Sequence, residues 1–501
     1  MTAHVTGLII FITTLAMYGI AMYCFTKSKI KPALLLVIIA GFILRVYVSS
    51  DNYLHPWDER YHALVAKNMI SHPLTPTLYE DPVLPYDYKE WYSNHYWVHK
   101  QPMPLWFISA SLQVVGINEF AVRIPGILLT TLGILLVYYI GNFFFNKRVA
   151  FISALLYSMN GLIIELTGGR VATDNYDIFF LFFIQLAVFF CIKFINTEKK
   201  AYNILVGVAI GFAILTKWLP ALIVIPIWYI LVYDSGKFSK KQIFIQLALL
   251  VFVLVVVALP WQIYSAKAFP LETAWEQYYN NLHLTEALEG RSEARWFFLE
   301  RLRISYGDLI YLPLIWFTIQ TLKGKFLNKQ YALLIWVFIP IIFFTIAETK
   351  MQGYILFTAP ALFIITGLFY DKINELKFSG IKRVFAIIIL ALLILLPFRY
   401  CVERTKMLNP NTTSTEWVKD LKKLGETNHG KAILFNYPRP IEAMFYTDFI
   451  VYNTIPDIES LKGIQKLGYK IYFAGSNNLP ETIRENPDYQ IIEMNDIPEL
   501  K

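Results

Sequence analysis

The feature that most constrains this chain is a series of long apolar segments spread over its first four hundred residues. A helix needs roughly 17 to 25 apolar residues to cross the hydrocarbon core of a bilayer, where each backbone polar group must be bonded within its own segment. About twelve segments meet this requirement. They lie near residues 3–25, 32–50, 120–145, 149–166, 175–196, 201–217, 218–233, 242–265, 306–322, 330–347, 352–371 and 382–399. The sequence therefore predicts an all-α polytopic membrane protein with about twelve transmembrane helices.

The composition supports this class. Hydrophobic residues make up 56% of the 501 positions and charged residues only 16%, whereas about 25% of a soluble domain is charged. The formal charge of +8 comes from lysines and arginines that concentrate in short loops between apolar segments. Such residues set the orientation of the helices in the bilayer. The pattern argues against nucleic acid as a partner.

The distribution of these basic residues also predicts the sidedness of the loops. If the segments alternate across the membrane, the inner loops are 27–31, 147–148, 193–200, 237–241, 323–329 and 372–383, all rich in lysine or arginine. The loops assigned to the outer side are then 51–104, 168–174, 265–304 and 348–354. The first apolar segment, 3–25, is too long for a signal-peptide core and reads as a retained helix with its N-terminus outside.

The composition changes after about residue 400. Short β-type runs at 432–436, 450–453, 470–474 and 489–494 alternate with helical patterns at 415–424, 458–467 and 480–485. We therefore expect a transmembrane domain over 1–400 and a small soluble α/β domain over 401–501, on the outer side. Within the first domain, 51–104 is the first extracytoplasmic loop and 265–304 a long extracytoplasmic loop. Two helical patches, 59–70 and 104–115, are too short or too polar to span, so we expect them at the interface.

Three acids in the outer loops are candidates for catalysis. Asp58 and Glu59 are adjacent in the first loop, and Asp174 lies where the 168–174 loop enters the next span. A partly desolvated carboxylate at the membrane surface can act as a general base or orient a substrate. Each acid also suits a purely structural role at a helix N-terminus. The residues alone leave both interpretations open.

Several outer-loop cations suit an anionic ligand. Lys100 precedes a proline-aromatic segment, and Lys350 with Tyr354 lies in a tight outer connection. A lysine there can meet a lipid phosphate as a compact point charge, although an interfacial lysine extending to the headgroups is an equally ordinary explanation. Two outer-loop histidines, His99 and His283, leave open a divalent metal such as zinc or magnesium. No third ligand is visible, and no other cofactor is indicated.

An ordered set of motifs resembles the polytopic glycosyltransferases of the GT-C fold, specifically the branch with the protein O-mannosyltransferases and the lipid A aminoarabinose transferase. The motifs cover most of residues 45 to 370 and are Asp58-Glu59-Arg60-Tyr61, the segment His99 to Trp106, Asn118 to Pro125, Gly169-Arg170 through Asp174, Leu215-Thr216-Lys217, Leu259-Pro260-Trp261, and Glu348-Thr349-Lys350 leading to Tyr354 and Pro360. The sequence departs from the pattern at His99, where the aminoarabinose enzymes carry an acid, and near His283, where an expected arginine is absent.

The resemblance implies an inverting glycosyltransferase in the plasma (inner) membrane with its site on the extracytoplasmic face. The donor would be a sugar on a polyprenyl monophosphate, and the acceptor a glycolipid of the lipid A type, a protein or a cell-envelope glycan. Asp58 would be the principal catalytic acid, with Glu59 accessory and Asp174 at the acceptor. The donor phosphate would be held by Lys100, Lys350, Tyr354, Arg60 and Arg170.

Two other functions remain as alternatives. A transporter or flippase of lipid-linked sugars is also polytopic, but transporters tend to carry ionisable groups at the membrane midplane and inverted repeats. Here the charges lie in the outer loops and the sequence shows no repeat. A ligase or polymerase of lipid-linked glycans is a nearer alternative that would differ in its donor.

Overall fold

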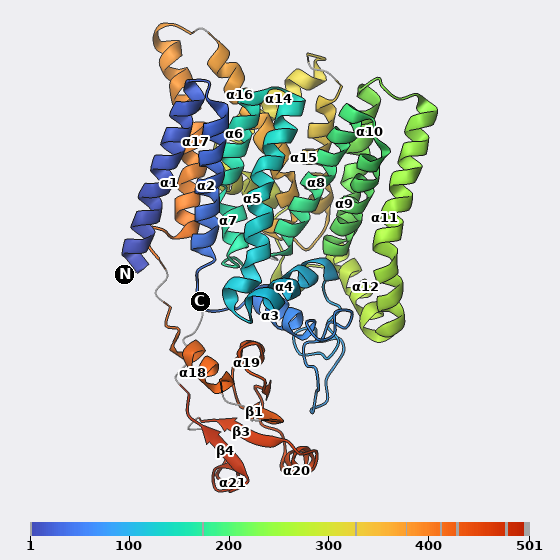
Figure 1. Ribbon diagram of the computed structural model, residues 1–501, viewed down its shortest axis with the longest axis vertical. Helices are drawn as coiled ribbons and strands as arrows, with labels where there is room; N and C mark the ends of the chain where they lie inside the picture. Colours follow the sequence, from blue (N-terminus) through green and yellow to red (C-terminus); the bar gives the residue numbers. More distant parts are fainter. Residues whose placement is uncertain are drawn as a thin grey trace. The chain divides into compact units, whose positions relative to one another are not determined.

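The computed structural model describes residues 3–172, 175–325, 328–376, 378–410, 413–426, 430–475 and 479–494 (Figure 1). The chain forms two compact units. The first, called the helical unit below, comprises Met1–Ser50, Gly126–Ala268 and Gln277–Asn411. The second, called the loop unit, comprises Asp51–Pro125, Phe269–Glu276 and Thr412–Lys501. The first outer loop thus forms one compact body with the C-terminal region, whereas the sequence analysis grouped that loop with the transmembrane domain.

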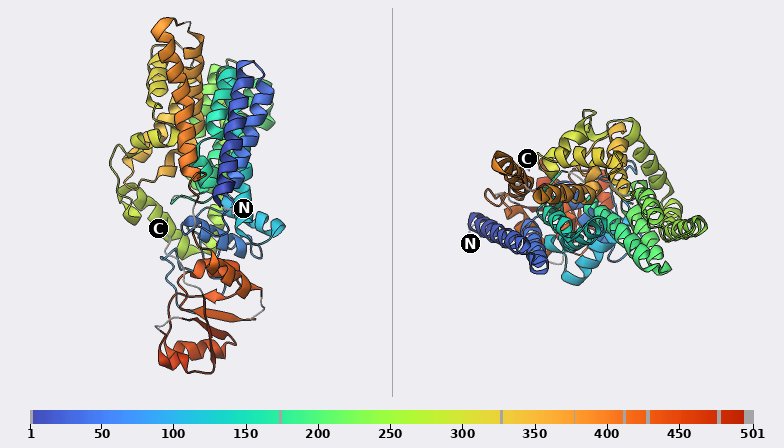
Figure 2. Two further views of the ribbon diagram at one scale, coloured as in Figure 1. Left: turned by 90° about the vertical axis from the view of Figure 1, so that its left-hand side faces the viewer. Right: turned by 90° about the horizontal axis from the view of Figure 1, so that it is seen from above.

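The helical unit is built from α-helices joined by short turns. They are α1 (Ala3–Thr26), α2 (Ile30–Val48), most of α5 (Glu119–Phe144), α6 (Lys147–Ser158), α7 (Gly161–Thr167), α8 (Tyr176–Thr197), α9 (Lys200–Lys217), α10 (Val224–Asp234), α11 (Lys240–Ala268), α13 (Phe297–Tyr306), α14 (Tyr311–Leu322), α15 (Gln330–Ile346), α16 (Ala359–Glu375) and α17 (Gly380–Thr405). Three 3₁₀ segments are η1 (Leu219–Ile223), η2 (Leu288–Gly290) and η3 (Gln352–Thr358). Seen from above, most of these helices appear nearly end-on, so they run roughly parallel to one another (Figure 2).

Within the described ranges, eight helices are long and apolar enough to cross a membrane. The pair α6 and α7, bent by 48° at its break, makes up to nine. Asn160 starts the second half of this pair, because its side chain accepts a hydrogen bond from the Ile163 N–H at 3.0 Å. The remaining three predicted spans correspond to shorter apolar helices at Leu219–Asp234, Tyr311–Leu322 and Gln330–Ile346. The prediction of a multi-spanning helical protein is confirmed.

The lysine-bearing turns of the helical unit gather at one end of its helices. The turns after α1, α10 and α16 lie together at the top of Figure 1, and each falls in a loop that the sequence assigned to the inner side. The C-terminal end of α7 lies toward the opposite end. These connections agree with the predicted grouping of the loops, and which group is extracytoplasmic stays a prediction.

Small residues allow neighbouring helices to approach closely. In α9, Gly207 and Gly211 are one turn apart and face α11, and a Cβ atom added at Gly207 would lie 2.8 Å from the Val253 Cβ. At Gly211 it would lie 2.6 Å from the Val257 Cγ1. Close backbone approach of this kind is a common source of helix association in a bilayer, where apolar burial alone gives no preference.

The 265–304 segment differs from the expected long loop, because most of it is helical. Helix α12 (Pro270–Thr285) occupies its first half and α13 its end. Pro270 at the first helical position and Glu272 in the first turn both favour a helix start there. The polar composition of α12 hid this helix from a search for apolar segments.

The loop unit begins with two short helices that match the predicted patches. They are α3 (Asp58–Asn68) and α4 (Pro102–Val115). Pro102 opens α4, where its missing N–H is not needed, and Gly116 follows the helix with a φ of 98°. The positive φ at Gly116 is a conformation that glycine adopts without strain.

The C-terminal part of the loop unit is a small α/β domain, as predicted. Its four strands are β1 (Ala432–Phe435), β2 (Ile450–Val451), β3 (Lys470–Ala474) and β4 (Tyr489–Ile492), and its helices are α18 (Glu416–Gly425), α19 (Pro440–Tyr446), α20 (Ile458–Lys466) and α21 (Glu481–Arg484). The strands are all parallel, in the order β2-β1-β3-β4. A buried apolar core that includes Ile433, Phe435 and Phe473 fills the space beside the sheet. Helix α19 was not predicted.

The first loop packs directly on this domain. The Tyr452 hydroxyl accepts a hydrogen bond from the Val83 N–H at 3.0 Å. The rings of Tyr79 and Tyr452 stack with their centroids 5.0 Å apart, and the Tyr79 hydroxyl donates to the Val451 carbonyl oxygen at 3.1 Å. These contacts explain why segments over 300 residues apart in sequence form one compact unit.

Candidate active site

Asp58 is the first residue of α3, and its side chain is partly exposed. The residue before it, Trp57, is exposed and gives the helix no side-chain cap. A carboxylate at this position benefits from the partial positive charge of the helix N-terminus. None of the ion pairs that join described residues uses Asp58. Its carboxylate is therefore available to a substrate.

Glu59 has the opposite environment. Its side chain is 2% exposed, and both of its oxygens accept hydrogen bonds from the Arg123 guanidinium, at 2.7 and 3.0 Å. One of them also accepts the His55 N–H at 2.8 Å. Burial by itself would raise the pKa of Glu59, but the charge and hydrogen bonds of Arg123, with His55, hold the pKa below its usual range. The Glu59 carboxylate therefore stabilises the fold.

Arg123 extends the same network to the start of the first loop. Its guanidinium also donates to the backbone carbonyl oxygens of Asp51 and Tyr53, at 2.6 and 2.7 Å. With Glu59, it therefore fixes the chain that leads into α3. The predicted accessory catalytic role of Glu59 does not follow from this geometry, whereas a structural role does.

Arg60 is also used structurally. Its guanidinium donates to both carboxylate oxygens of Glu442, which is fully buried in α19, at 3.2 and 3.4 Å. It donates as well to the Tyr61 hydroxyl at 3.2 Å. These contacts tie α3 to the α/β domain. They do not favour the predicted role of Arg60 in binding a phosphate.

Aromatic rings surround His99. The His99 ring stacks on Trp91 with centroids 4.6 Å apart and planes 7° apart, and Trp97 meets it edge-on at 5.7 Å. Tyr61, one turn after Asp58 on α3, meets Trp91 edge-on at 5.0 Å. The His99 Nδ1 lies 3.0 Å from a carboxylate oxygen of Glu276, in the second turn of α12. Asp58 thus shares its helix face with the edge of an aromatic group, a surface suited to a sugar ring.

Lys100 follows this group and is partly buried, just before α4. Its position at the end of the first loop agrees with the sequence analysis. It belongs to the same unit as Asp58.

Lys350 in the helical unit is buried, at 3% exposure. Its ammonium group donates to the carbonyl oxygen of Ala347 at 2.7 Å and to that of Glu348 at 3.4 Å. The side chain therefore closes its own turn. The predicted contact of Lys350 with a lipid phosphate is not favoured by this arrangement.

Tyr354 lies in η3 beside a different cation. The Lys217 ammonium lies 4.8 Å from the centre of its ring, and Phe344 contacts the same ring at 5.1 Å. Lys217 also forms an ion pair with Asp177, whose side chain is 2% exposed, while that of Lys217 is 19% exposed. The ends of α8 and α9 and the segment η3 thus place an acid, a lysine and a tyrosine together.

Arg170 and Asp174 are the other predicted site residues within the range of the helical unit. The Arg170 guanidinium donates to the Thr405 carbonyl oxygen at 2.8 Å and lies 5.6 Å from the centre of the Tyr47 ring. Asp174 lies outside the described residues. Its predicted role at the acceptor stays a prediction.

The histidines do not assemble a metal-binding set. In the described part of the chain, no group of three or more histidine, cysteine, aspartate or glutamate side chains is arranged to hold a metal ion. His99 faces Glu276, and the His283 Nδ1 lies 2.9 Å from the Tyr279 carbonyl oxygen. We therefore derive no step through a metal, and the predicted zinc or magnesium stays untested.

Sequence reasoning gave no role to three residues that organise these clusters, Arg123, Lys217 and Glu276, although Arg123 and Lys217 lie in motifs of the resemblance. Arg123 and Lys217 lie at or near the ends of predicted apolar spans, where a charged residue is rare and needs a partner. That rarity was the available signal. Their partners were not visible, because Glu59 lies 64 residues before Arg123 and Asp177 lies 40 residues before Lys217.

Comparison with known proteins supports the predicted resemblance. Residues 99–261 match a family model described as dolichyl-phosphate-mannose-protein mannosyltransferase. The undecaprenyl phosphate-alpha-4-amino-4-deoxy-L-arabinose arabinosyl transferase of Yersinia pestis (strain Pestoides F) is 26% identical over 365 residues, 69% of this chain and 61% of that protein. The enzyme of the same name from Pseudomonas savastanoi pv. phaseolicola is 27% identical over 303 residues, 57% of this chain and 54% of that protein. The chain thus matches under two thirds of the length of these relatives.

Solved structures show the same fold. ArnT from Cupriavidus metallidurans, bound to undecaprenyl phosphate, aligns with a TM-score of 0.59 at 15% identity over 86% of this chain and 87% of that one. The archaeal oligosaccharyltransferase AglB from Archaeoglobus fulgidus aligns with a TM-score of 0.56 at 14% identity over 84% of this chain and 64% of that one. The predicted GT-C architecture with a small C-terminal α/β domain is confirmed.

Proposed function

We propose that this chain, which shares the GT-C fold and matches the mannosyltransferase family model over residues 99–261, is an inverting glycosyltransferase of the plasma (inner) membrane. It transfers a sugar from a polyprenyl-monophosphate donor to an acceptor on the extracytoplasmic side. The observation that carries the proposal is the contrast at the start of α3, where Asp58 is accessible and Glu59 is locked to Arg123.

In this proposal Asp58 acts on the acceptor. For a hydroxyl acceptor, its carboxylate takes the proton as the acceptor oxygen attacks the anomeric carbon from the side opposite the phosphate. The bond from carbon to the new oxygen forms, the bond to the phosphate oxygen breaks, and the polyprenyl phosphate leaves with the electron pair. One displacement inverts the anomeric carbon. For a phosphate acceptor no proton transfer is needed, and Asp58 orients the acceptor.

Lys100 serves the donor. The leaving phosphate gains negative charge in the transition state, and a nearby ammonium group stabilises that charge more than it stabilises the ground state. Lys100 lies in the same unit as Asp58 and next to His99 in the aromatic group. Trp91 and Tyr61 offer ring faces and edges for the sugar.

The relatives suggest the chemical class of the donor. Those described above are named for undecaprenyl phosphate-linked 4-amino-4-deoxy-L-arabinose, and a solved neighbour holds undecaprenyl phosphate. A polyprenyl phosphate therefore suits the lipid part of the donor. The sugar and the acceptor, whether glycolipid, protein or glycan, are to be found by mass analysis of the envelope with and without the gene.

Substitution of Asp58 tests the proposal. Asp58→Asn in proteoliposomes with a polyprenyl-phosphate-sugar is expected to lower the transfer rate by roughly 10² to 10⁴, the usual contribution of a positioned general base. The thermal midpoint should fall only slightly, because the side chain is partly exposed, joins no ion pair with a described residue, and gains only about 0.3–1 kcal/mol from the helix N-terminus. The matched control is Asp87→Asn, which neutralises an exposed acid of the same loop. Normal transfer by Asp58→Asn would remove Asp58 from the mechanism.

A further inference from the structure

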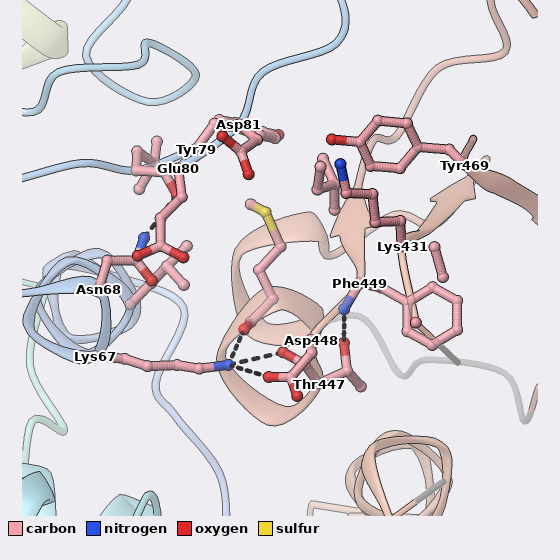
Figure 3. Close-up of a pocket in the computed structure, with 16 residues that line it drawn as sticks. Lys67, Asn68, Tyr79, Glu80, Asp81, Lys431, Thr447, Asp448, Phe449 and Tyr469 are labelled. Carbon is pink, nitrogen blue, oxygen red and sulfur yellow. Dashed lines mark hydrogen bonds and ion pairs between the residues drawn. The ribbon is translucent and has the colours of Figure 1, made fainter. Parts of the chain in front are cut away.

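A pocket of about 320 Å³ lies in the loop unit, away from the first turn of α3 (Figure 3). Its walls come from the third turn of α3, the segment from Leu78 to Asp81, the start of β1 and the segment from Thr447 to Ile450. Every lining residue belongs to one compact unit. Pockets for small ligands range from roughly 300 to 1,000 Å³, so this one suits a single ring.

Hydrogen bonds and an ion pair join the residues at the floor of the pocket. The Lys67 ammonium group donates to the carbonyl oxygens of Met444 and Thr447 at 2.8 and 2.7 Å, and it lies 3.6 Å from an Asp448 carboxylate oxygen. Nearby, the Asn68 amide donates to the carbonyl oxygens of Thr77 and Leu78 at 3.0 and 3.3 Å. These bonds hold the walls together before any ligand arrives.

The charge of the lining is net negative. Three carboxylates, those of Glu80, Asp81 and Asp448, face two ammonium groups, those of Lys67 and Lys431. Lys67 is already held by backbone oxygens, while Glu80 and Asp81 are exposed. Partial desolvation raises the pKa of Glu80, and repulsion from Asp81 and Asp448 adds to the rise, although Lys67 and His72 oppose it. A cation entering the pocket would relieve this repulsion.

The other wall is aromatic. Figure 3 shows Tyr469 and Lys431 across the cavity from Glu80, and the Lys431 ammonium lies 5.6 Å from the centre of the Tyr469 ring. Lys431 covers part of this ring, so a hydroxylated ring in the cavity would pack on the uncovered part of Tyr469, with its amine and hydroxyls directed away from Lys431 and donating to the acids opposite. The described residues offer no three-ligand metal set here, so an organic cation fits better than a metal ion.

We propose that this pocket binds one sugar unit that carries a protonated amine, with Glu80 and Asp81 accepting hydrogen bonds from its ammonium and hydroxyl groups and Tyr469 packing on the ring. The site is distinct from the reaction centre: Asp58 and Lys67 are nine residues apart on α3, which is about 14 Å along the helix axis. Binding at this pocket does not require the proposed transfer reaction.

Saturation-transfer NMR on the full-length chain in detergent tests this site. D-glucosamine, D-glucose and D-glucuronate are titrated separately. The negative lining predicts that glucosamine binds most tightly and glucuronate least. The double substitution Glu80→Gln with Asp81→Asn should weaken glucosamine binding at least about tenfold, which is about 1.4 kcal/mol, because both acceptors lose their charge.

Two variants separate a binding effect from misfolding. Glu459→Gln removes an equivalent charge from the exposed first turn of α20 and should leave the glucosamine signal unchanged. Tyr469→Ala keeps the charge of the pocket and should weaken glucosamine. Absence of glucosamine binding, an affinity that ignores the double substitution, or ethanolamine competing as well as glucosamine would each overturn the proposal. Because no donor is present, this result is independent of the Asp58 transfer assay.

Discussion

Two buried ion pairs, one in each unit, illustrate two uses of charge. In the loop unit, Glu59 and Arg123 are 2% and 1% exposed, and Arg123 also binds two backbone carbonyls. In the helical unit, Asp177 is as buried as Glu59, but its partner Lys217 is 19% exposed and also faces the Tyr354 ring. The hydrogen bonds of the first pair stabilise the fold. The second keeps a cation near the surface, where it can meet a ligand.

Loss of Arg123 should have the largest effect. Arg123→Met leaves the Glu59 carboxylate buried without its partner, and breaking such a pair costs about 3–5 kcal/mol. Thermal unfolding in detergent should show a markedly lower midpoint. The double variant Glu59→Met with Arg123→Met should recover most of the loss, because no buried charge remains. Equal instability of the single and double variants would mean that the carbonyl contacts of Arg123 matter more than its ion pair.

Loss of Lys217 should cost less. Lys217→Met also removes the ion partner of a buried carboxylate, that of Asp177, but Lys217 is partly exposed and donates to no backbone carbonyl among the described residues, so we expect roughly 1–3 kcal/mol. The same unfolding assay measures this loss, with Lys217→Arg as the control that keeps the charge. If Lys217→Met destabilised the chain as much as Arg123→Met, the distinction between the two pairs would fail.

The loop pair should also give stability a dependence on pH. Since the pKa of Glu59 is held below its ordinary value of 4.5 in the folded state, its contribution is complete above that ordinary value. The contribution is lost as the pH falls from there through the folded pKa. The unfolding midpoint measured from pH 7 down to pH 3 should therefore fall at the acid end. This component should be missing in the Glu59→Met, Arg123→Met double variant.

The smallest effect is expected at Tyr354. Tyr354→Leu removes the ring that faces Lys217, which corresponds to about 0.5–1 kcal/mol for a partly exposed cation and ring. Tyr354→Phe retains the ring and should match the parent chain in thermal unfolding. A loss in Tyr354→Phe as large as that in Tyr354→Leu would show that the hydroxyl group, rather than the ring face, is what counts.

Much of the fold could be predicted because its signals are local. The apolar spans and the strands of the C-terminal domain follow from hydrophobic runs and alternation within short windows. Helix α12 was not predicted because its composition is polar, and α19 was not predicted because it is only seven residues long. Packing of the first loop on the α/β domain rests on partners such as Tyr79 and Tyr452, whose pairing no local pattern reveals.

The candidate site was less predictable, because burial and partners decide what a charged residue does. Asp58 and Glu59 are chemically similar and adjacent, and only the position of Arg123 separates an accessible acid from a locked one. Lys350 lies in a loop of the sequence, yet its ammonium group is buried and donates to the carbonyl oxygens of Ala347 and Glu348. Sequence can nominate loops, but tertiary contacts decide which of their charged side chains stabilise the fold and which stay accessible.

Because the first loop packs on the C-terminal region, it cannot complete its folding until the end of the chain has been synthesised. Arg60 and Glu442 are 382 residues apart, and at about 5–20 residues per second a ribosome needs roughly 20 to 80 seconds to make the intervening chain. Throughout that time the first loop lacks its partner in the C-terminal region. Its contacts with the α/β domain can form only after the last hundred or so residues have been made, so a truncation near the C-terminus should also destabilise the first loop.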